Sequence, residues 1–281
     1  MLPLPDPRQS TNVFHTMTET RTLQTTGARR GCISGAQIAV TMKCLAGASL
    51  LALVTAECRA DPPPKNPYPT MAPLEQYLMP RDAEIALARS AGPESITRDA
   101  EVLVFGPRGY ETAVPGRNGF VCAVQRAWAS PIDDPEFWNP KSRSPNCWNP
   151  AAARYCVPLM VKKTKLVLEG KSKAEIVAGI KAALGAGEFP PLGTGAMCFM
   201  MSKEGHLNDR AGHWHPHLMF FLHQEPAAAW GANLEGSPVI SVTDDIDKVT
   251  TFMVPVRRWS DGSSDVLPAE VHAVDDSTHT H

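Results

Sequence analysis

The sequence predicts an α+β fold, with a largely antiparallel sheet of about seven strands and two or three helices. Short apolar or alternating segments recur along the chain between turns rich in Gly and Pro, which is typical of strands joined by hairpins. Helical patterns are confined to a few segments, and no regular alternation of strands and helices indicates a parallel sheet. Hydrophobic residues make up 43% of the chain, which is enough to build a sizeable core.

The expected elements follow from these patterns in chain order. A short helix over 81–90 ends before Gly92-Pro93, and Ser172 with Glu175 forms a capping box that predicts a second helix over 172–184. A long proline-containing loop is expected over 130–150, followed by a segment that is helical in parts over 151–169. The expected strands cover residues 101–105, 110–114, 120–128, 196–202, 216–223, 239–242 and 251–256. The first three of them are expected to form an antiparallel meander.

Composition divides the chain into five expected segments. Residues 1–41 lack periodicity, and we expect translation to start at Met42, so that they do not belong to the mature protein. Met42-Lys43 and the short apolar run after it have the features of a secretory signal peptide over 42–60. A proline-rich linker over 61–70, a single globular domain over 71–260 and a disordered tail over 261–281 complete the expected organisation.

The signal predicts an exported bacterial protein, periplasmic or secreted. Its apolar run is shorter than the about 20 residues that span a bilayer, so no transmembrane anchor is expected. A twin-arginine signal at Arg29-Arg30 and a lipoprotein at Cys58 are less favoured alternatives. The net charge of −2 and the lack of a long basic block argue against nucleic acid as a partner. Nothing in the sequence predicts an oligomeric state.

Three alternating histidines give the clearest chemical signal. Alternate residues of a strand point to the same face, so His213, His215 and His217 are expected to share one side of the backbone and to bind a metal ion. In a straight strand the first and last would lie about 13 Å apart, too far to share a Zn²⁺ ion with Zn–N bonds of about 2.0 Å. The prediction therefore needs a bend at Pro216 or a borrowed ligand.

The neighbouring segments offer such ligands. His206, Asn208 and Asp209 precede the histidines, and the run Met197-Cys198-Phe199-Met200-Met201 is rich in sulfur. Soft sulfur ligands would favour copper, whereas imidazole and carboxylate alone would suit zinc or iron. Core packing of flexible methionines is the alternative explanation of the run.

We therefore expect a divalent metal site, zinc or copper, at His213, His215 and His217. A metal-dependent hydrolase is the enzyme class that such a site favours. One alternative is an imidazole cluster that orients a substrate or transfers protons. The other is a non-catalytic envelope or ligand-binding protein with structural histidines. No G-x-S-x-G, P-loop or H-E-x-x-H motif is present, so the sequence predicts no catalytic residue.

The loop over 130–150 carries a second signal. Phe137-Trp138-Asn139-Pro140 and Cys147-Trp148-Asn149-Pro150 share a pattern in which the tryptophans either pin the loop to the domain or form an aromatic platform. A platform would make a carbohydrate or another small molecule the expected partner. Asp133, Asp134 and Glu136 could add acid–base groups.

Four cysteines lie in the expected domain, at positions 122, 147, 156 and 198. They allow three pairings into two disulfides, and at least one disulfide is expected in an oxidising compartment. A pair between Cys122 and Cys147 would staple the long loop to the meander. A catalytic thiol at Cys198, with His213 or His215 as its base, is a less favoured alternative.

Four segments resemble a family of exported bacterial proteins whose activity is not known. They are Gly119-Phe120-Val121-Cys122, Phe137-Trp138-Asn139-Pro140, Gly195-Ala196-Met197-Cys198 and the run from His213 to Phe221. The resemblance covers most of residues 75–262. It implies export and a single domain, and it supplies no catalytic role.

Overall fold

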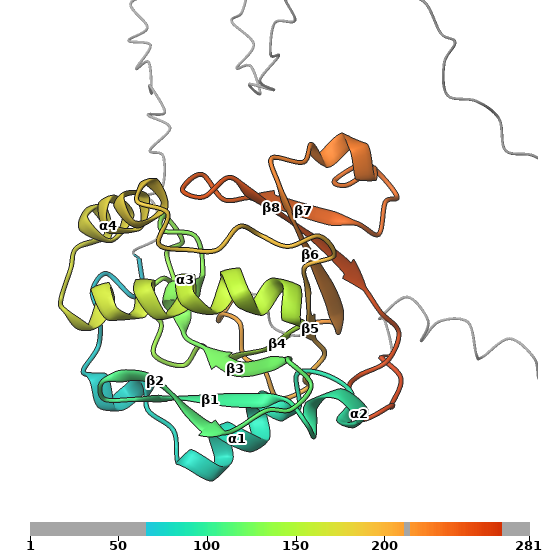
Figure 1. Cartoon of the computed structure of the whole chain (residues 1–281), viewed down its shortest axis with the longest axis horizontal. Coiled ribbons are helices and arrows are strands. Elements are labelled where there is room, and N and C mark those ends of the chain that lie inside the picture. The colour runs from blue at the N-terminus through green and yellow to red at the C-terminus, as the bar shows by residue number, and fades with distance from the viewer. Residues whose placement is uncertain (1–65, 211–213, 266–281) are drawn as a thin grey trace, which may run out of the picture. The chain divides into compact units, whose positions relative to one another are not determined.

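An eight-stranded sheet forms the centre of the part of the chain that the structure, a computed structural model, describes: residues 66–210 and 214–265. The strand order is β2-β1-β3-β4-β5-β6-β8-β7 (Figure 1). All neighbouring strands are antiparallel except β1 and β3, which confirms the predicted α+β fold. The strands are β1 (Glu101–Gly106), β2 (Gly109–Val114), β3 (Val121–Gln125), β4 (Ser144–Trp148), β5 (Met197–Met200), β6 (His217–His223), β7 (Ile240–Thr243) and β8 (Val249–Pro255).

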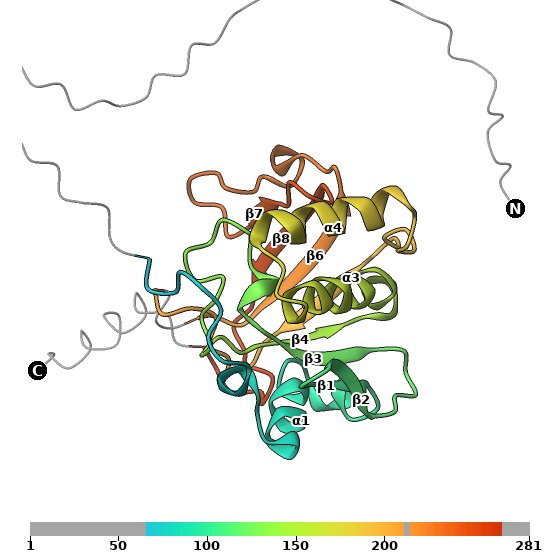
Figure 2. The same cartoon turned by 90° about the vertical axis from the view of Figure 1, so that its left-hand side faces the viewer.

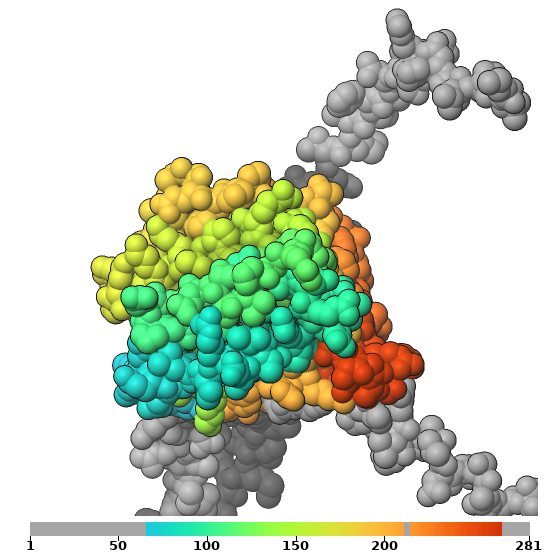
Figure 3. Space-filling view, turned by 60° about the horizontal axis from the view of Figure 1, so that its bottom comes forward, coloured from blue at the N-terminus to red at the C-terminus, as the bar shows by residue number. Residues whose placement is uncertain are grey.

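Helices cover both faces of one half of this sheet. They are α1 (Arg81–Arg89), α2 (Glu94–Thr97), α3 (Pro150–Leu168) and α4 (Lys173–Gly185). Because alternate strand residues point to opposite faces, Val102 and Cys122 pack with α1 on one face, whereas Leu103 and Ala123 pack with α3 on the other. Figures 1 and 2 show α3 running across the sheet with α4 beside it. Figure 3 brings the bottom of Figure 1 forward, where the segment with α1 and α2 (cyan) forms the lower part of the surface.

The predicted helices agree with the structure where capping chemistry defined them. The side chain of Ser172 accepts a hydrogen bond from the backbone N–H of Glu175, and the carboxylate of Glu175 accepts one in return, so the capping box is formed. The segment predicted to be only partly helical is instead one helix of 19 residues, with Pro158 inside it. Its N-cap is Asn149, whose side chain accepts from the backbone of Ala152.

The predicted meander of the first three strands is wrong. β1 and β2 form an antiparallel hairpin, but β3 lies on the other side of β1 and runs parallel to it. The connection passes close to the start of β1, where a Cβ atom on Gly116 would lie 2.3 Å from the backbone nitrogen of Glu101. Glycine permits this close approach, so the glycine-containing turn crosses β1 instead of closing a second hairpin.

The predicted loop over 130–150 is wrong at its end, because residues 144–148 form β4. All five residues of β4 are buried, and the strand lies between β3 and β5 in the middle of the sheet. Pro145 occupies a position opposite Val124, where tertiary packing outweighs the low strand propensity of proline.

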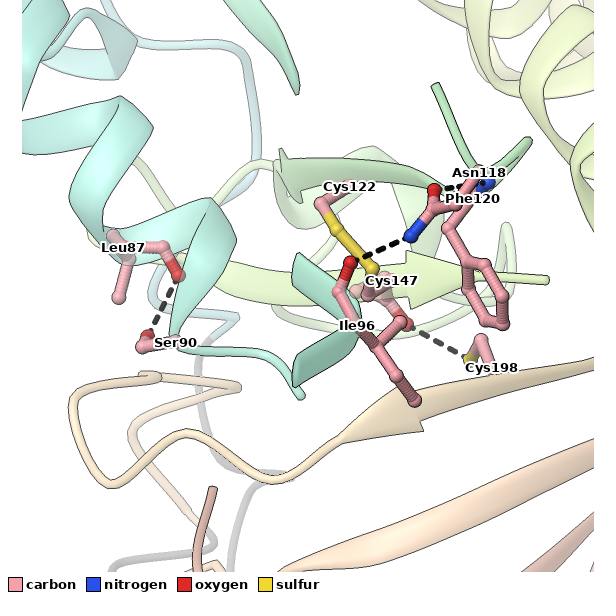
Figure 4. The surroundings of a disulfide bond; sticks show 9 residues. Leu87, Ser90, Ile96, Asn118, Phe120, Cys122, Cys147 and Cys198 are labelled. Carbon is pink, nitrogen blue, oxygen red and sulfur yellow. Dashed lines mark hydrogen bonds between the residues drawn. A yellow bond between two sulfur atoms is a disulfide. The ribbon is translucent and has the colours of Figure 1, made fainter. Parts of the chain in front are cut away.

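Cys122 and Cys147 lie opposite each other on β3 and β4 and form a disulfide (Figure 4). This confirms the expectation of at least one disulfide, although the bond joins two central strands and does not anchor a loop. Cys156 and Cys198 are free thiols. The thiol of Cys198 donates to Oδ1 of Asn146.

Loss of this disulfide is expected to destabilise the protein. Its two cysteines are 25 residues apart, and closing a loop of that length contributes about 3 kcal/mol through the unfolded state. We expect the double variant C122A/C147A to lose about that much free energy of unfolding in a urea titration. The control is C156A, which leaves the disulfide intact. Equal stability of the wild type and the double variant would contradict the prediction.

The terminal segments lie mostly outside the described residues. The expected non-mature segment, the signal peptide and half of the linker fall within residues 1–65, and most of the expected tail falls within 266–281. Residues 261–265, assigned to the tail from the sequence, are folded: Ser264 forms a bridge with Arg258, and Asp265 is buried. No helix among the described residues is long and apolar enough to cross a membrane.

Candidate functional site

A cavity of about 410 Å³ lies between α3 and the sheet. This volume is in the range of about 300–1,000 Å³ that is usual for small-molecule sites. Helix α3 contributes Tyr155, Cys156, Leu159, Met160 and Lys163 to its walls. The strands contribute mainly apolar side chains to the opposite wall: Trp148, Met200, Met219, Phe221 and Val249. The polar side chains of this wall are Gln125, Ser144, Asn146 and Thr251.

The cavity follows from a mismatch between the sheet and its helices. Eight strands about 4.8 Å apart make a sheet about 34 Å wide, which two helices with diameters of about 10 Å cannot cover. β4 is accordingly buried throughout, whereas six of the seven residues of β6 are only half-buried and His223 is exposed. At the far edge, Ile240 and Val242 of β7 are exposed. The helical layer therefore leaves a space above β6 and β8.

Lys163 places an amino group in this mostly apolar cavity. Its Nζ donates a hydrogen bond to the backbone oxygen of Ser130 at 3.0 Å and lies 5.4 Å from the ring centroid of Phe137. Burial lowers the pKa of Lys163 to about 8, although the carboxylates of Asp244 and Asp247 act in the opposite direction. The amine is thus partly uncharged near neutral pH.

A hydrogen-bonded pair separates this cavity from a second one. The hydroxyl of Tyr155 donates to Oδ2 of Asp247 at 2.8 Å, and both residues line a cavity of about 280 Å³ on their other side, together with His223 and Phe189. Burial raises the pKa of Tyr155 and that of Asp247. Burial also raises the pKa of the neighbouring Cys156 to about 12, which keeps its thiol protonated.

The structure describes two of the three predicted metal ligands. His213 lies outside the described residues. Nδ1 of His215 is 2.7 Å from Oδ2 of Asp265, and Nδ1 of His217 donates to the backbone oxygen of His215 at 2.8 Å. Because a carbonyl oxygen only accepts, the proton of a neutral His217 sits on Nδ1, and its Nε2 keeps a lone pair. Burial lowers the pKa of His217, which favours this neutral form.

His217 and the cavity share one face of the sheet. His217 begins β6 opposite Met200 and precedes Met219 by two residues, and both methionines line the cavity. The ring of Trp214 packs edge-on against that of His217. Nε1 of Trp214 donates a hydrogen bond to the backbone oxygen of Ser202. Within 66–210 and 214–265, no three His, Cys, Asp or Glu side chains form a group that could hold a metal ion.

The proposed additional ligands have other partners. His206 and Asp209 lie 3.0 Å apart, and Asp209 also accepts from Tyr68 and Lys141. These contacts hold the loop before the histidine segment in place, and the hydrogen bond from Tyr68 is the main reason why the pKa of Asp209 is low.

The acidic residues near the first tryptophan fix the same loop. Asp134 and Glu136 both accept hydrogen bonds from the guanidinium group of Arg210. Trp138 is buried and packs edge-on against Phe137, and Trp148 is buried with its side chain at the cavity wall. Trp138 thus pins the loop, Trp148 belongs to β4, and neither forms an exposed platform.

One spacing pattern in the sequence, which the predictions above did not include, indicates the helical wall of the cavity. Cys156, Leu159, Met160 and Lys163 are spaced i, i+3, i+4 and i+7, the pattern of one apolar helix face. A lysine at the last of these positions indicates an amine on the buried side of the helix.

Comparisons of the chain with protein-family models, with curated proteins and with solved structures found no match.

Proposed function

We propose that the protein binds a small, mainly apolar molecule in the cavity between α3 and the sheet. The observation that carries this proposal is the cavity itself, which has a volume of about 410 Å³ and a wall made largely of methionine, leucine, phenylalanine and tryptophan side chains. Apolar walls supply the affinity, and a few polar groups fix the orientation of the ligand. Burial of Trp138 in the loop and of Trp148 in β4 favours an apolar ligand over a carbohydrate.

We further propose that the protein is exported to the periplasm or the extracellular space. The predicted signal peptide over 42–60 is the main support, and the Cys122–Cys147 disulfide agrees with an oxidising compartment.

Titration with the neutral fluorophore N-phenyl-1-naphthylamine tests the ligand proposal. The dye is small enough for the cavity, and its fluorescence rises in apolar surroundings. We expect saturable binding of one dye molecule per chain with a Kd of about 1–10 μM, typical of modest apolar ligands. An unsaturable or absent signal would contradict the proposal.

A metal site at His213, His215 and His217 is a second candidate function, favoured by the way the two described histidines are held. Metal-bound histidines usually donate their other ring nitrogen to a carboxylate or a backbone carbonyl. Asp265 and the carbonyl of His215 are such partners for Nδ1 of His215 and His217, and Nε2 of the neutral His217 keeps a lone pair for a metal ion. Zinc or copper held there would activate a water molecule for hydrolysis.

Elemental analysis of the untagged protein tests this second candidate. We expect about one zinc or copper ion per chain in the wild type and a loss of at least about tenfold in metal affinity in H215A and H217A. The control is H223A, because His223 is exposed at the far end of β6. A wild type that stays metal-free after incubation with either ion would rule the site out.

A further inference from the structure

We propose that Lys163 is a nucleophilic amine that forms a reversible imine with an aldehyde or ketone bound in the cavity. This inference rests on the proposed ligand-binding function and names the ligand class: an apolar carbonyl compound. Lysine amines in apolar pockets are suited to this chemistry because desolvation favours their uncharged, nucleophilic form.

The position of Lys163 supports this role. The side chain leaves the cavity-facing side of α3 among Leu159 and Met160, so a ligand that enters the cavity meets the amine directly. The hydrogen bond to Ser130 and the contact with the ring of Phe137 hold the amino group at one place in the wall. With a pKa of about 8, roughly a tenth of the amine is uncharged at pH 7, compared with less than about a thousandth for an ordinary lysine.

The charges around Lys163 argue against an anionic ligand. Asp134, Asp244 and Asp247 line the same cavity, and the cation Arg126 is already paired with Glu84. The carboxylates would repel a ligand carboxylate or phosphate. A neutral carbonyl group avoids this repulsion, and it can use the amine as a nucleophile instead of as a counterion.

The reaction is balanced without an oxidant or a reductant. The lone pair of the uncharged Nζ attacks the carbonyl carbon, the carbon–oxygen π electrons move to the oxygen, and a proton moves from nitrogen to that oxygen to give a carbinolamine. A second proton transfer to the hydroxyl lets it leave as water while the nitrogen lone pair forms the C=N bond. Tyr155 and Asp247 line the same cavity, and the raised pKa of Asp247 suits it to exchange these protons.

Cys156 is the other nucleophile in the cavity wall. Its thiol stays protonated because burial raises its pKa to about 12, and the thiolate is the reactive form. The structure therefore favours the lysine.

Reductive trapping tests the proposal. The purified protein is incubated with 2-naphthaldehyde and sodium cyanoborohydride, and modified peptides are identified by mass spectrometry. We expect Lys163 to be labelled at least about tenfold faster than Lys165, which lies two residues later on the same helix and is exposed. Its labelling should rise with pH up to about 8, and K165M, changed at an exposed residue outside the cavity, should be labelled at Lys163 like the wild type.

Two variants and one binding measurement separate the possible outcomes. K163M and K163R should lose the fast labelling while keeping the circular dichroism spectrum of the wild type, which shows that they are folded. If 2-naphthaldehyde displaces the dye but Lys163 is labelled no faster than Lys165, the imine proposal is wrong and the ligand-binding function stands. If the wild type binds neither the dye nor the aldehyde, both proposals are wrong.

Discussion

Replacing Glu84 with alanine is expected to lower the free energy of unfolding by about 3–5 kcal/mol, because it leaves a buried charge without a partner. Arg126 and Glu84 form an ion pair at 2.9 Å, and their side chains are 0% and 1% exposed. The guanidinium group also donates to the backbone oxygens of Tyr77 and Val124, but these neutral acceptors do not balance its charge.

The exposed pair of Arg81 and Glu111 provides a matched control. Its side chains are 49% and 58% exposed, and pairs of this kind contribute at most about 1 kcal/mol. Urea unfolding of E84A and E111A should therefore separate the two variants clearly. Equal losses in both would show that the buried pair has no special role. Because Arg126 also lines the cavity, E84A is expected to weaken dye binding as well.

Filling the cavity from the sheet side is expected to weaken dye binding by at least about tenfold, since a bulky side chain would occupy the volume that the ligand needs. Thr251 on β8 lines the cavity and is half-buried, so T251W should block the site with little disturbance of the central core.

The control for this variant is T243W. Thr243 lies on β7 opposite Thr250, the neighbour of Thr251, so its side chain projects from the other face of the same part of the sheet. The same Thr→Trp change there should leave dye affinity within about twofold of the wild type. Unchanged binding in T251W, measured with the same fluorescence titration, would place the dye elsewhere on the protein.

The helices α1 and α4 and most strands could be predicted because local chemistry defines them. The capping box at Ser172 and Glu175 specifies where α4 begins, and alternating or continuous apolar runs specify β1 and β6. The errors arose where tertiary packing decides. β4 contains Pro145 in a short polar context, and only its place between β3 and β5 explains its strand conformation. The parallel pairing of β3 with β1 depends on the close approach at Gly116.

The candidate site was harder to predict because its walls come from distant parts of the chain. Lys163 belongs to α3, Asp247 to the β7–β8 turn and Met219 to β6, and no local pattern brings them together. The histidine segment was visible because its residues are adjacent. Even there, sequence spacing did not reveal that Asp265 and the carbonyl of His215 bind the two Nδ1 atoms.

The most direct test of the ligand cavity is a crystal structure of the protein with 2-bromonaphthalene. We expect an anomalous bromine peak between α3 and strands β6 and β8, in contact with Leu159 and Met219. The same crystals of T251W should lack that peak. A bromine peak only on the protein surface, with the cavity filled by protein side chains, would contradict the account.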